Sequence, residues 1–227
     1  MIIPAAGSGS RMGSTKPKPF LLLGKKSILW HTICAFSKVD YVVQVIIPTS
    51  EEWIKEVELI CASIPNQVID YKVITGGSER QYSILNGLEY LNEDVELVAV
   101  HDAVRPFISE KLIDRTCAVA SKFGGAIVGV PAKDTIKKID NDLNILETPN
   151  RKELWQAQTP QIFKKEILLS AYNSAMADKF VGTDDASLVE RIGGVVKLVE
   201  GDRENLKITY PVDLKIAELI LKEEGRI

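Results

Sequence analysis

The 227-residue chain lacks several features, and each absence excludes a class of protein. No apolar run reaches the roughly 18 residues that a membrane-spanning helix needs. The 28 lysines and arginines do not exceed the 31 aspartates and glutamates, and the net charge is −3. A protein that coats nucleic acid carries a large basic excess instead. We therefore expect a protein that acts on neither membranes nor nucleic acid.

Cysteine and histidine are also scarce. Cys34, Cys61 and Cys117 form no CxxC pair, and with only two histidines they cannot assemble a zinc site of the usual spacing. We expect them to be reduced thiols in the core. The first residues, MIIPAAGSGSRMG, have no basic segment followed by a long apolar core, as a secretory signal would. Both observations favour a cytoplasmic protein.

Short apolar runs alternate with helical patterns along the chain. Helices are predicted over Glu79–Leu91 and Glu110–Lys122, after Ser50, after a turn ending at Ser27, and from Pro211. The predicted strands are Ile2–Pro4, Val42–Ile47, Val68–Thr75, Leu97–His101, Ala126–Val130 and Val195–Val199. Several are apolar without alternation, which is typical of strands buried on both faces. The pattern predicts one α/β domain over residues 1–227, with a doubly wound, mostly parallel sheet.

One segment departs from this alternation. Two short polar β runs, Asp134–Ile139 and Leu143–Thr148, surround Asn141 and Asp142 and predict a β-hairpin arm at about residues 133–156. A two-stranded arm is only marginally stable alone, so we expect it to pack on a second subunit.

A loop of small residues, Pro4–Gly13, follows the first predicted strand. Its backbone amides can approach phosphate oxygens closely. Its three glycines nearly match a dinucleotide fingerprint, but the last gap is one residue too long. Arg11 and Lys18 add two cations, which suit a triphosphate. A solvated loop with incidental charges is the alternative.

Two further motifs follow other predicted strands. Asp102 is placed to hold Mg²⁺ on a nucleotide, and Arg105 can pair with it or with a substrate anion. His101 is expected to be a packed strand-end residue and not a base. The glycine turn at Gly76–Ser83 can offer backbone donors to a ligand, or Ser78 can simply cap the next helix. Ligands of doubly wound folds bind beyond the carboxyl ends of the strands, where all three motifs fall.

Seven ordered motifs, from residue 4 to about residue 218, resemble the 2-C-methyl-D-erythritol 4-phosphate cytidylyltransferase family. They read PAAGSGSRMG with PKPF, GGSERQYS, HDAVRPF, PAKDTIK, LWQAQTPQIF, GTDDASLVE and NLKITYPVDLKIAE. The resemblance implies a fold like that of nucleotide-diphospho-sugar transferases, with a protruding β-hairpin arm, and a homodimer interlocked through the arms. It also implies that CTP and methylerythritol phosphate react, with Mg²⁺, to give a CDP-alcohol and pyrophosphate in isoprenoid biosynthesis.

The resemblance further implies a role for each matching position. The catalytic residues would be Arg11, Lys18, Arg151 and Lys207. The nucleotide-binding residues would be Pro4, Ala5, Ala6, Gly7, Gly9, Gly77, Ser83, Asp102 and Ala103. The substrate-binding residues would be Asp102, Arg105, Thr135, Arg151, Thr159 and Thr183, with Asp102 also on the metal side. Thr135 and Arg151 belong to the arm and would face the neighbouring subunit's site.

This chemistry agrees with the residue content. The attacking phosphate oxygen is already ionised, so no strong base is required, and neither histidine is placed like one. Two alternatives remain. Val104 is similar to the residue of ribitol-5-phosphate cytidylyltransferases at this position, so another polyol phosphate can be the acceptor. A non-catalytic nucleotide-binding module is the other, although it would not need all of Arg11, Lys18, Asp102 and Lys207.

Overall fold

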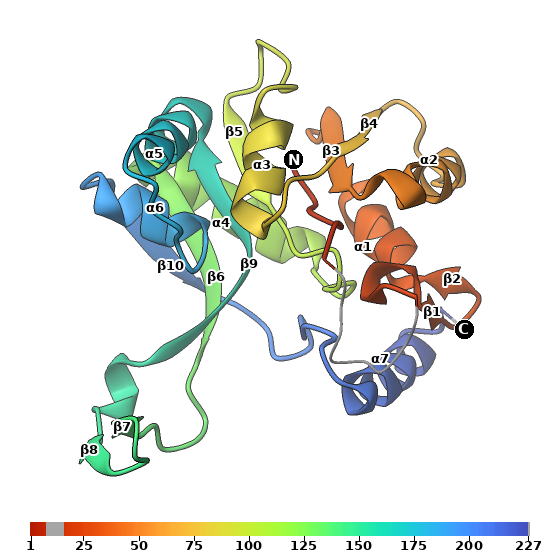
Figure 1. Cartoon of the computed structure of the whole chain (residues 1–227). Helices are drawn as coiled ribbons and strands as arrows, with labels where there is room; N and C mark the ends of the chain where they lie inside the picture. The colour runs from red at the N-terminus through yellow and green to blue at the C-terminus, as the bar shows by residue number, and fades with distance from the viewer. Residues whose placement is uncertain (8–15, 227) are drawn as a thin grey trace.

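The computed structural model describes residues 1–7 and 16–226, and a twisted mixed sheet forms its centre (Figure 1). The strands of this sheet are β3 (Gln44–Thr49), β4 (Asp70–Thr75), β5 (Leu97–Val100), β6 (Gly125–Pro131), β9 (Trp155–Lys164) and β10 (Val196–Glu200). They lie in the order β10-β6-β9-β5 and β3-β4. Ile2 joins the two parts, because it forms parallel bridges to Ile46 in β3 and to Val100 in β5.

The sheet is mostly parallel, as predicted, with one exception. β10 is parallel to β6 and β3 to β4, whereas β9 runs antiparallel to both β5 and β6. Strand β9 was not predicted, because its polar residues form no apolar run. Gln158, Thr159 and Gln161 are in fact buried, and each is hydrogen-bonded to a residue of another segment. Partners far along the chain therefore make this polar stretch a central strand.

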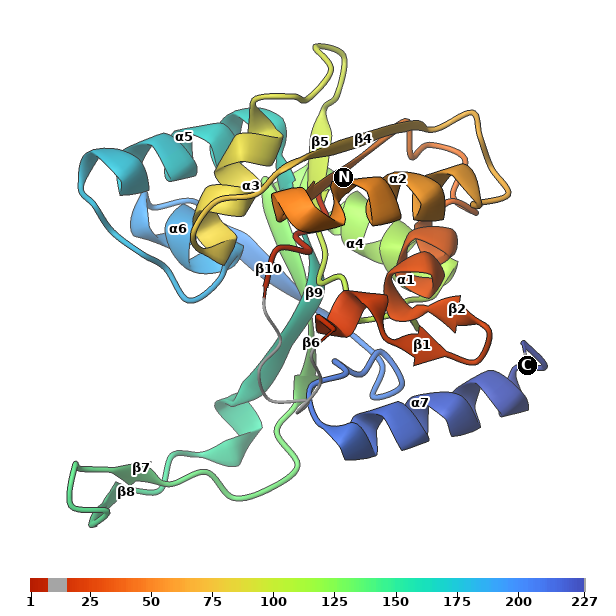
Figure 2. The same cartoon turned by 45° about the vertical axis from the view of Figure 1, so that its right-hand side comes forward.

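Helices cover both faces of the sheet, as the doubly wound fold requires (Figures 1 and 2). They are α1 (Ile28–Phe36), α2 (Ile54–Ala62), α3 (Arg80–Leu88), α4 (Glu110–Phe123), α5 (Lys165–Ala177), α6 (Asp185–Arg191) and α7 (Pro211–Glu223). Buried side chains of α1, α2 and α4 belong to one hydrophobic cluster, and those of α3, α5 and α6 to a second. Helix α7 packs in a third, smaller cluster with the short strand β1 (Leu22–Leu23), which pairs with β2 (Lys26–Ser27).

Some predicted element ends are confirmed and others are wrong. Helix α4 begins at Glu110 and α7 at Pro211, as predicted, and Gly124 follows the end of α4 with a φ of 100°. Ser78 does not cap α3, because this helix begins at Arg80 with Glu79 in the N-cap position. Helices α5 and α6 were not predicted. The predicted strand at Ile2–Pro4 is reduced to the two bridges of Ile2.

The segment predicted as an arm contains a short antiparallel pair, β7 (Lys138–Ile139) and β8 (Ile145–Glu147). Figures 1 and 2 show this pair at a distance from the sheet, at the end of two connecting segments. The apolar side chains of Leu143, Ile145 and Leu146 are 75%, 63% and 59% exposed. The apolar surface of this hairpin is therefore not covered by other parts of the same chain.

Cys34, Cys61 and Cys117 are free thiols, and Cys61 is buried. Among the helices of residues 1–7 and 16–226, none has the length and apolar character needed to cross a membrane.

Candidate active site

A cavity of about 370 Å³ lies at the carboxyl edge of the sheet. Its wall comes from the segments that follow Ile2, β4 and β5, together with the start of the 3₁₀ turn η2 (Lys18–Phe20) and the segment before α7. It brings together ten residues of the predicted site, namely Pro4, Ala5, Ala6, Gly7, Lys18, Gly77, Ser83, Asp102, Ala103 and Lys207. The predicted residues Gly9 and Arg11 lie outside the described residues.

A second cavity, of about 490 Å³, lies at the opposite edge of the sheet, near Gln44 and Leu97. Its lining is mainly apolar, and in the described part of the chain no lysine or arginine contributes to it. A phosphorylated ligand requires cations or aligned backbone amides, and the cavity of about 370 Å³ offers both, through Lys18, Arg80, Lys207 and the glycine turn, so it is the candidate active site.

The glycine turn after β4 needs its glycines. A Cβ on Gly77 would lie 2.4 Å from the Cβ of Tyr82, and one on Gly76 would lie 2.8 Å from the Cβ of Ala6. Ser83 fixes the turn, because its Oγ accepts a hydrogen bond from the Gly77 amide at 3.0 Å and donates one to the Glu79 carbonyl at 3.0 Å. Because side chains do not fit at these two positions, the backbone of the turn itself forms part of the cavity wall.

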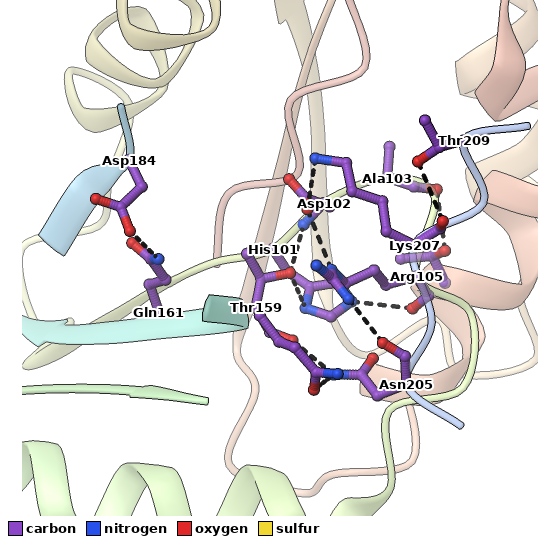
Figure 3. Close-up of polar contacts among 12 residues, drawn as sticks. His101, Asp102, Ala103, Arg105, Thr159, Gln161, Asp184, Asn205, Lys207 and Thr209 are labelled. Carbon is purple, nitrogen blue, oxygen red and sulfur yellow. Dashed lines mark hydrogen bonds and ion pairs between the residues drawn. The ribbon is translucent and has the colours of Figure 1, made fainter. Parts of the chain in front are cut away.

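Three cations surround the carboxylate of Asp102. Lys207 Nζ lies 3.0 Å and Arg105 Nε 3.2 Å from Asp102 Oδ2, and Arg80 Nε lies 3.8 Å from Asp102 Oδ1. Figure 3 shows the side chains of Lys207 and Arg105 both extending to Asp102. The four side chains carry a net charge of +2, so the cluster can attract an anion.

Burial of Asp102 by itself would raise the pKa of its carboxyl group. The charges of Lys207, Arg80 and Arg105 outweigh this effect and hold the pKa well below its usual range. Asp102 is therefore ionised near pH 7. It orders the cations around it, and it cannot serve as a proton donor.

A buried hydrogen-bond network stands behind Asp102. Thr159 Oγ1 accepts from the Asp102 amide at 3.0 Å and lies 3.1 Å from His101 Nδ1, while His101 Nε2 lies 3.0 Å from the Arg105 carbonyl. This pattern assigns the ring proton to Nε2. Arg105 also donates through Nη1 to the Asn205 carbonyl at 2.7 Å (Figure 3). Thr159 and Arg105, both predicted to bind substrate, therefore support Asp102 from behind and do not line the cavity.

Burial lowers the pKa of His101 to about 4, against small opposing contributions that include its hydrogen bond to the Arg105 carbonyl. His101 is fully buried, as predicted, and its ring is neutral near pH 7. It is a packed residue and not a base that can reach a substrate.

The structure does not bring the predicted arm residues to this cavity within one chain. Thr135 and Arg151 are exposed, and Arg151 donates to the Lys133 carbonyl at 2.9 Å. Thr183 lines a separate cavity of about 70 Å³ next to α6. These three positions do not complete the site of their own chain.

The sequence prediction missed Arg80, which lines the cavity together with Pro19, Ser78, Glu79 and Val104. The signal was available, because Arg80 lies in the glycine-turn motif and begins the helix that follows it. Its guanidinium contacts two carboxylates, because Nε lies near Asp102 and Nη2 pairs with the buried Asp185.

The donor set fits a Mg²⁺ ion held mainly by a nucleotide. Among the described residues no cluster of three metal-ligating side chains is present. Mg²⁺ commonly takes one or two protein carboxylates and completes its shell with substrate phosphates and water. Asp102 is ionised and lines the cavity, so it can serve as such a ligand.

Small residues and a glycine turn at the carboxyl edge of an α/β sheet, with lysines and arginines around one carboxylate, are the arrangement of a nucleotidyltransferase. The family model for 2-C-methyl-D-erythritol 4-phosphate cytidylyltransferase matches residues 1–223. The chain belongs to this family, and it is a nucleotidyltransferase enzyme.

Individual relatives agree with this assignment. The chain is 42% identical to the 2-C-methyl-D-erythritol 4-phosphate cytidylyltransferase of Caldanaerobacter subterraneus over 225 residues, which cover 98% of both chains. It is 44% identical to that of Alkaliphilus metalliredigens, with 98% of this chain and 92% of the relative covered. The crystal structure of 4-diphosphocytidyl-2C-methyl-D-erythritol synthase from Anaerococcus prevotii is 32% identical, with a TM-score of 0.86 and coverage of 97% and 96%.

Proposed function

We propose that the protein transfers the cytidylyl group of CTP to 2-C-methyl-D-erythritol 4-phosphate, releasing pyrophosphate and forming 4-diphosphocytidyl-2-C-methyl-D-erythritol, an isoprenoid precursor. The observation that carries this proposal is the cation cluster around Asp102 beside the glycine turn. Family membership supports the choice of both substrates. The free thiols suit the reducing cytoplasm, where we place the enzyme.

The reaction joins two anions, so positioning and charge neutralisation are the main tasks. The acceptor phosphate oxygen attacks the α-phosphorus of CTP in line with the departing pyrophosphate. Lys18 and Lys207 neutralise negative charge that accumulates on the phosphoryl group, together with Arg11. Asp102 would hold a Mg²⁺ ion, which would supply further charge neutralisation when bound. Loss of one such donor costs about 3–4 kcal/mol of transition-state stabilisation.

The nucleotide occupies the side of the cavity formed by Pro4–Gly7 and the glycine turn. Small side chains there leave room for the base, and backbone amides can donate hydrogen bonds to acceptor atoms of the base or to a phosphate. The acceptor occupies the side near Lys207. In a single chain no arm residue closes this side, which favours a second chain as the source of Arg151 and Thr135.

The exposed apolar side chains at the tip of the arm support a homodimer. Leu143, Ile145 and Leu146 together give the hairpin an apolar surface that a second copy would cover. The arms would interlock, and each would place Arg151 at its partner's cavity to orient the acceptor phosphate.

Pyrophosphate release tests this function. The purified protein is given CTP and Mg²⁺ with methylerythritol phosphate or with ribitol 5-phosphate, in separate reactions. We expect rapid release with methylerythritol phosphate and little with ribitol 5-phosphate. Preference for ribitol 5-phosphate would support the alternative that Val104 favours, since this residue lines the cavity. Tight CTP binding without release in any reaction would identify a binding module.

A further inference from the structure

Asp185 is a carboxylate that the proposed mechanism does not use. Its side chain is fully buried at the start of α6, yet both of its oxygens are engaged. Arg80 donates to Asp185 Oδ1 at 3.2 Å and to Oδ2 at 2.8 Å, and the Tyr172 hydroxyl donates to Oδ1 at 2.5 Å. This bidentate pair fixes the plane of the guanidinium.

Arg80 extends from this buried carboxylate to the active-site cavity. Its side chain is 34% exposed, it lines the cavity, and its Nε points to within 3.8 Å of Asp102. Of the three cations around Asp102, Arg105 is almost completely buried, while Lys207 is 43% exposed. Arg80 and Lys207 are therefore the two members of this group that an anion in the cavity can reach.

A buried ion pair is a poor way to gain stability, because its desolvation offsets much of the attraction between the charges. It is a good way to hold a cation still. An arginine whose geometry is set before the ligand arrives loses less conformational entropy on binding. Arg80 is the first residue of α3, directly after the glycine turn, and this places Arg80 on the nucleotide side of the cavity.

We propose that Asp185, with Tyr172, is a positioning site that holds Arg80 at the cavity wall, and that Arg80 binds the phosphate chain of the nucleoside triphosphate. The proposal rests on the proposed function for the identity of the nucleotide. The phosphate contact itself does not depend on which base or acceptor the enzyme uses.

The main test is Asp185→Asn, which keeps the shape of the side chain and removes its charge. The Kd of CTP and of inorganic triphosphate is measured by calorimetry, and KM and kcat are measured for each substrate. We expect Asp185→Asn and Arg80→Ala each to raise the Kd of CTP and of inorganic triphosphate about tenfold. The KM of the acceptor should change less than about twofold.

The double variant separates positioning from general damage. If Asp185 acts through Arg80, then Asp185→Asn adds nothing in the Arg80→Ala background. Independent, additive effects on the Kd of triphosphate would overturn the proposal. Asp184→Asn is the matched control, because Asp184 is the neighbouring carboxylate in the chain and contacts Gln161 and Ser187. Asp184 caps α6, and asparagine also caps helices well. This control should leave the Kd unchanged.

If Asp185→Asn does not fold, two milder substitutions still test the proposal. Tyr172→Phe removes one hydrogen bond to Asp185, and Arg80→Lys keeps the charge but loses the bidentate geometry. An unchanged Kd for triphosphate in both would refute the proposal. A protein that loses triphosphate affinity on substitution of Asp185, but never turns over CTP with a polyol phosphate, would refute the proposed function and leave the positioning site standing.

Discussion

Two neighbouring residues at the end of β5, His101 and Asp102, differ in charge state although both are buried. Asp102 is ionised because cations surround it, and its pKa lies well below the usual range, after burial is outweighed by Lys207, Arg80 and Arg105. His101 is neutral because burial lowers its pKa to about 4, which outweighs the opposing hydrogen bond to the Arg105 carbonyl and the charge of Asp102. The described wall of the site therefore contains the fixed charge of Asp102 and no histidine. This suits a nucleophile that arrives already ionised.

Burial of His101 makes the stability of the fold depend on pH. Its pKa falls from 6.5 to about 4 on folding, so between these values the unfolded chain binds a proton that the folded chain does not. Stability contributed by the neutral ring is present above pH 6.5 and is lost as the pH falls toward 4. Between pH 6.5 and pH 4, the free energy of unfolding measured in urea should fall by about 3 kcal/mol more for wild type than for His101→Asn.

The pH slope, and not the absolute stability, is the quantity to compare, because His101→Asn also disturbs hydrogen bonds to Thr159 and Arg105. Above pH 7 the two stability curves should run parallel. Parallel curves below pH 6.5 as well would show that His101 is protonated in the folded protein.

Backbone geometry at helix ends controls how the elements connect. Gly124 ends α4 with a φ of 100° directly before β6, and Gly193 takes a φ of 78° between α6 and β10. An alanine at either position must adopt a strained backbone. At Gly124 its Cβ would also lie 2.7 Å from the flexible end of Ile167, whereas at Gly193 the space is open.

These two glycines form a matched pair for mutation. We expect Gly193→Ala to reduce the free energy of unfolding by about 1 kcal/mol, and Gly124→Ala to reduce it by that amount plus up to about 1 kcal/mol more for moving Ile167. Chemical denaturation gives both values. CTP affinity should be unaffected, since neither glycine lines the cavity. Equal stability of Gly124→Ala and wild type would mean that the backbone there relaxes without cost.

At the level of the whole molecule, the proposed dimer would complete each cavity with an arm from the other chain. A hybrid dimer tests this directly, with Lys18→Ala in one subunit and Arg151→Ala in the other. One of its two composite sites is intact, so we expect about half the wild-type activity. Each parent homodimer should lose about 10²–10³ in rate or in acceptor affinity.

Mixing and refolding the two parents, with separate tags to purify the hybrid, gives the measurement. Activity no higher than that of the parents would show that Arg151 does not serve the neighbouring cavity. Substituting serine for Leu143, Ile145 and Leu146 provides an independent check, because it should give a monomer in sedimentation experiments. A stable dimer after these changes would place the interface elsewhere.

The sheet and the nucleotide side of the site could be predicted from the sequence, because their signals are local. Apolar runs indicate β3, β4 and β5, and the small residues of Pro4–Gly7 and the turn at Gly77 follow strands directly. Strand β9 could not be predicted in this way. Gln158 and Gln161 become buried only because Asp202 and Asp184 are brought beside them from other elements.

The sequence by itself determined which chemical groups meet at the carboxyl edge of the sheet, since residues that directly follow parallel strands must gather there. Only the tertiary structure decided which of them face the cavity and which support it from behind. Arg105 reaches the Asn205 carbonyl across a sequence separation of 100 residues, and Arg80 reaches Asp185 across 105. Contacts at such separations arise from packing of the whole fold, so no local pattern could have assigned these arginines their partners.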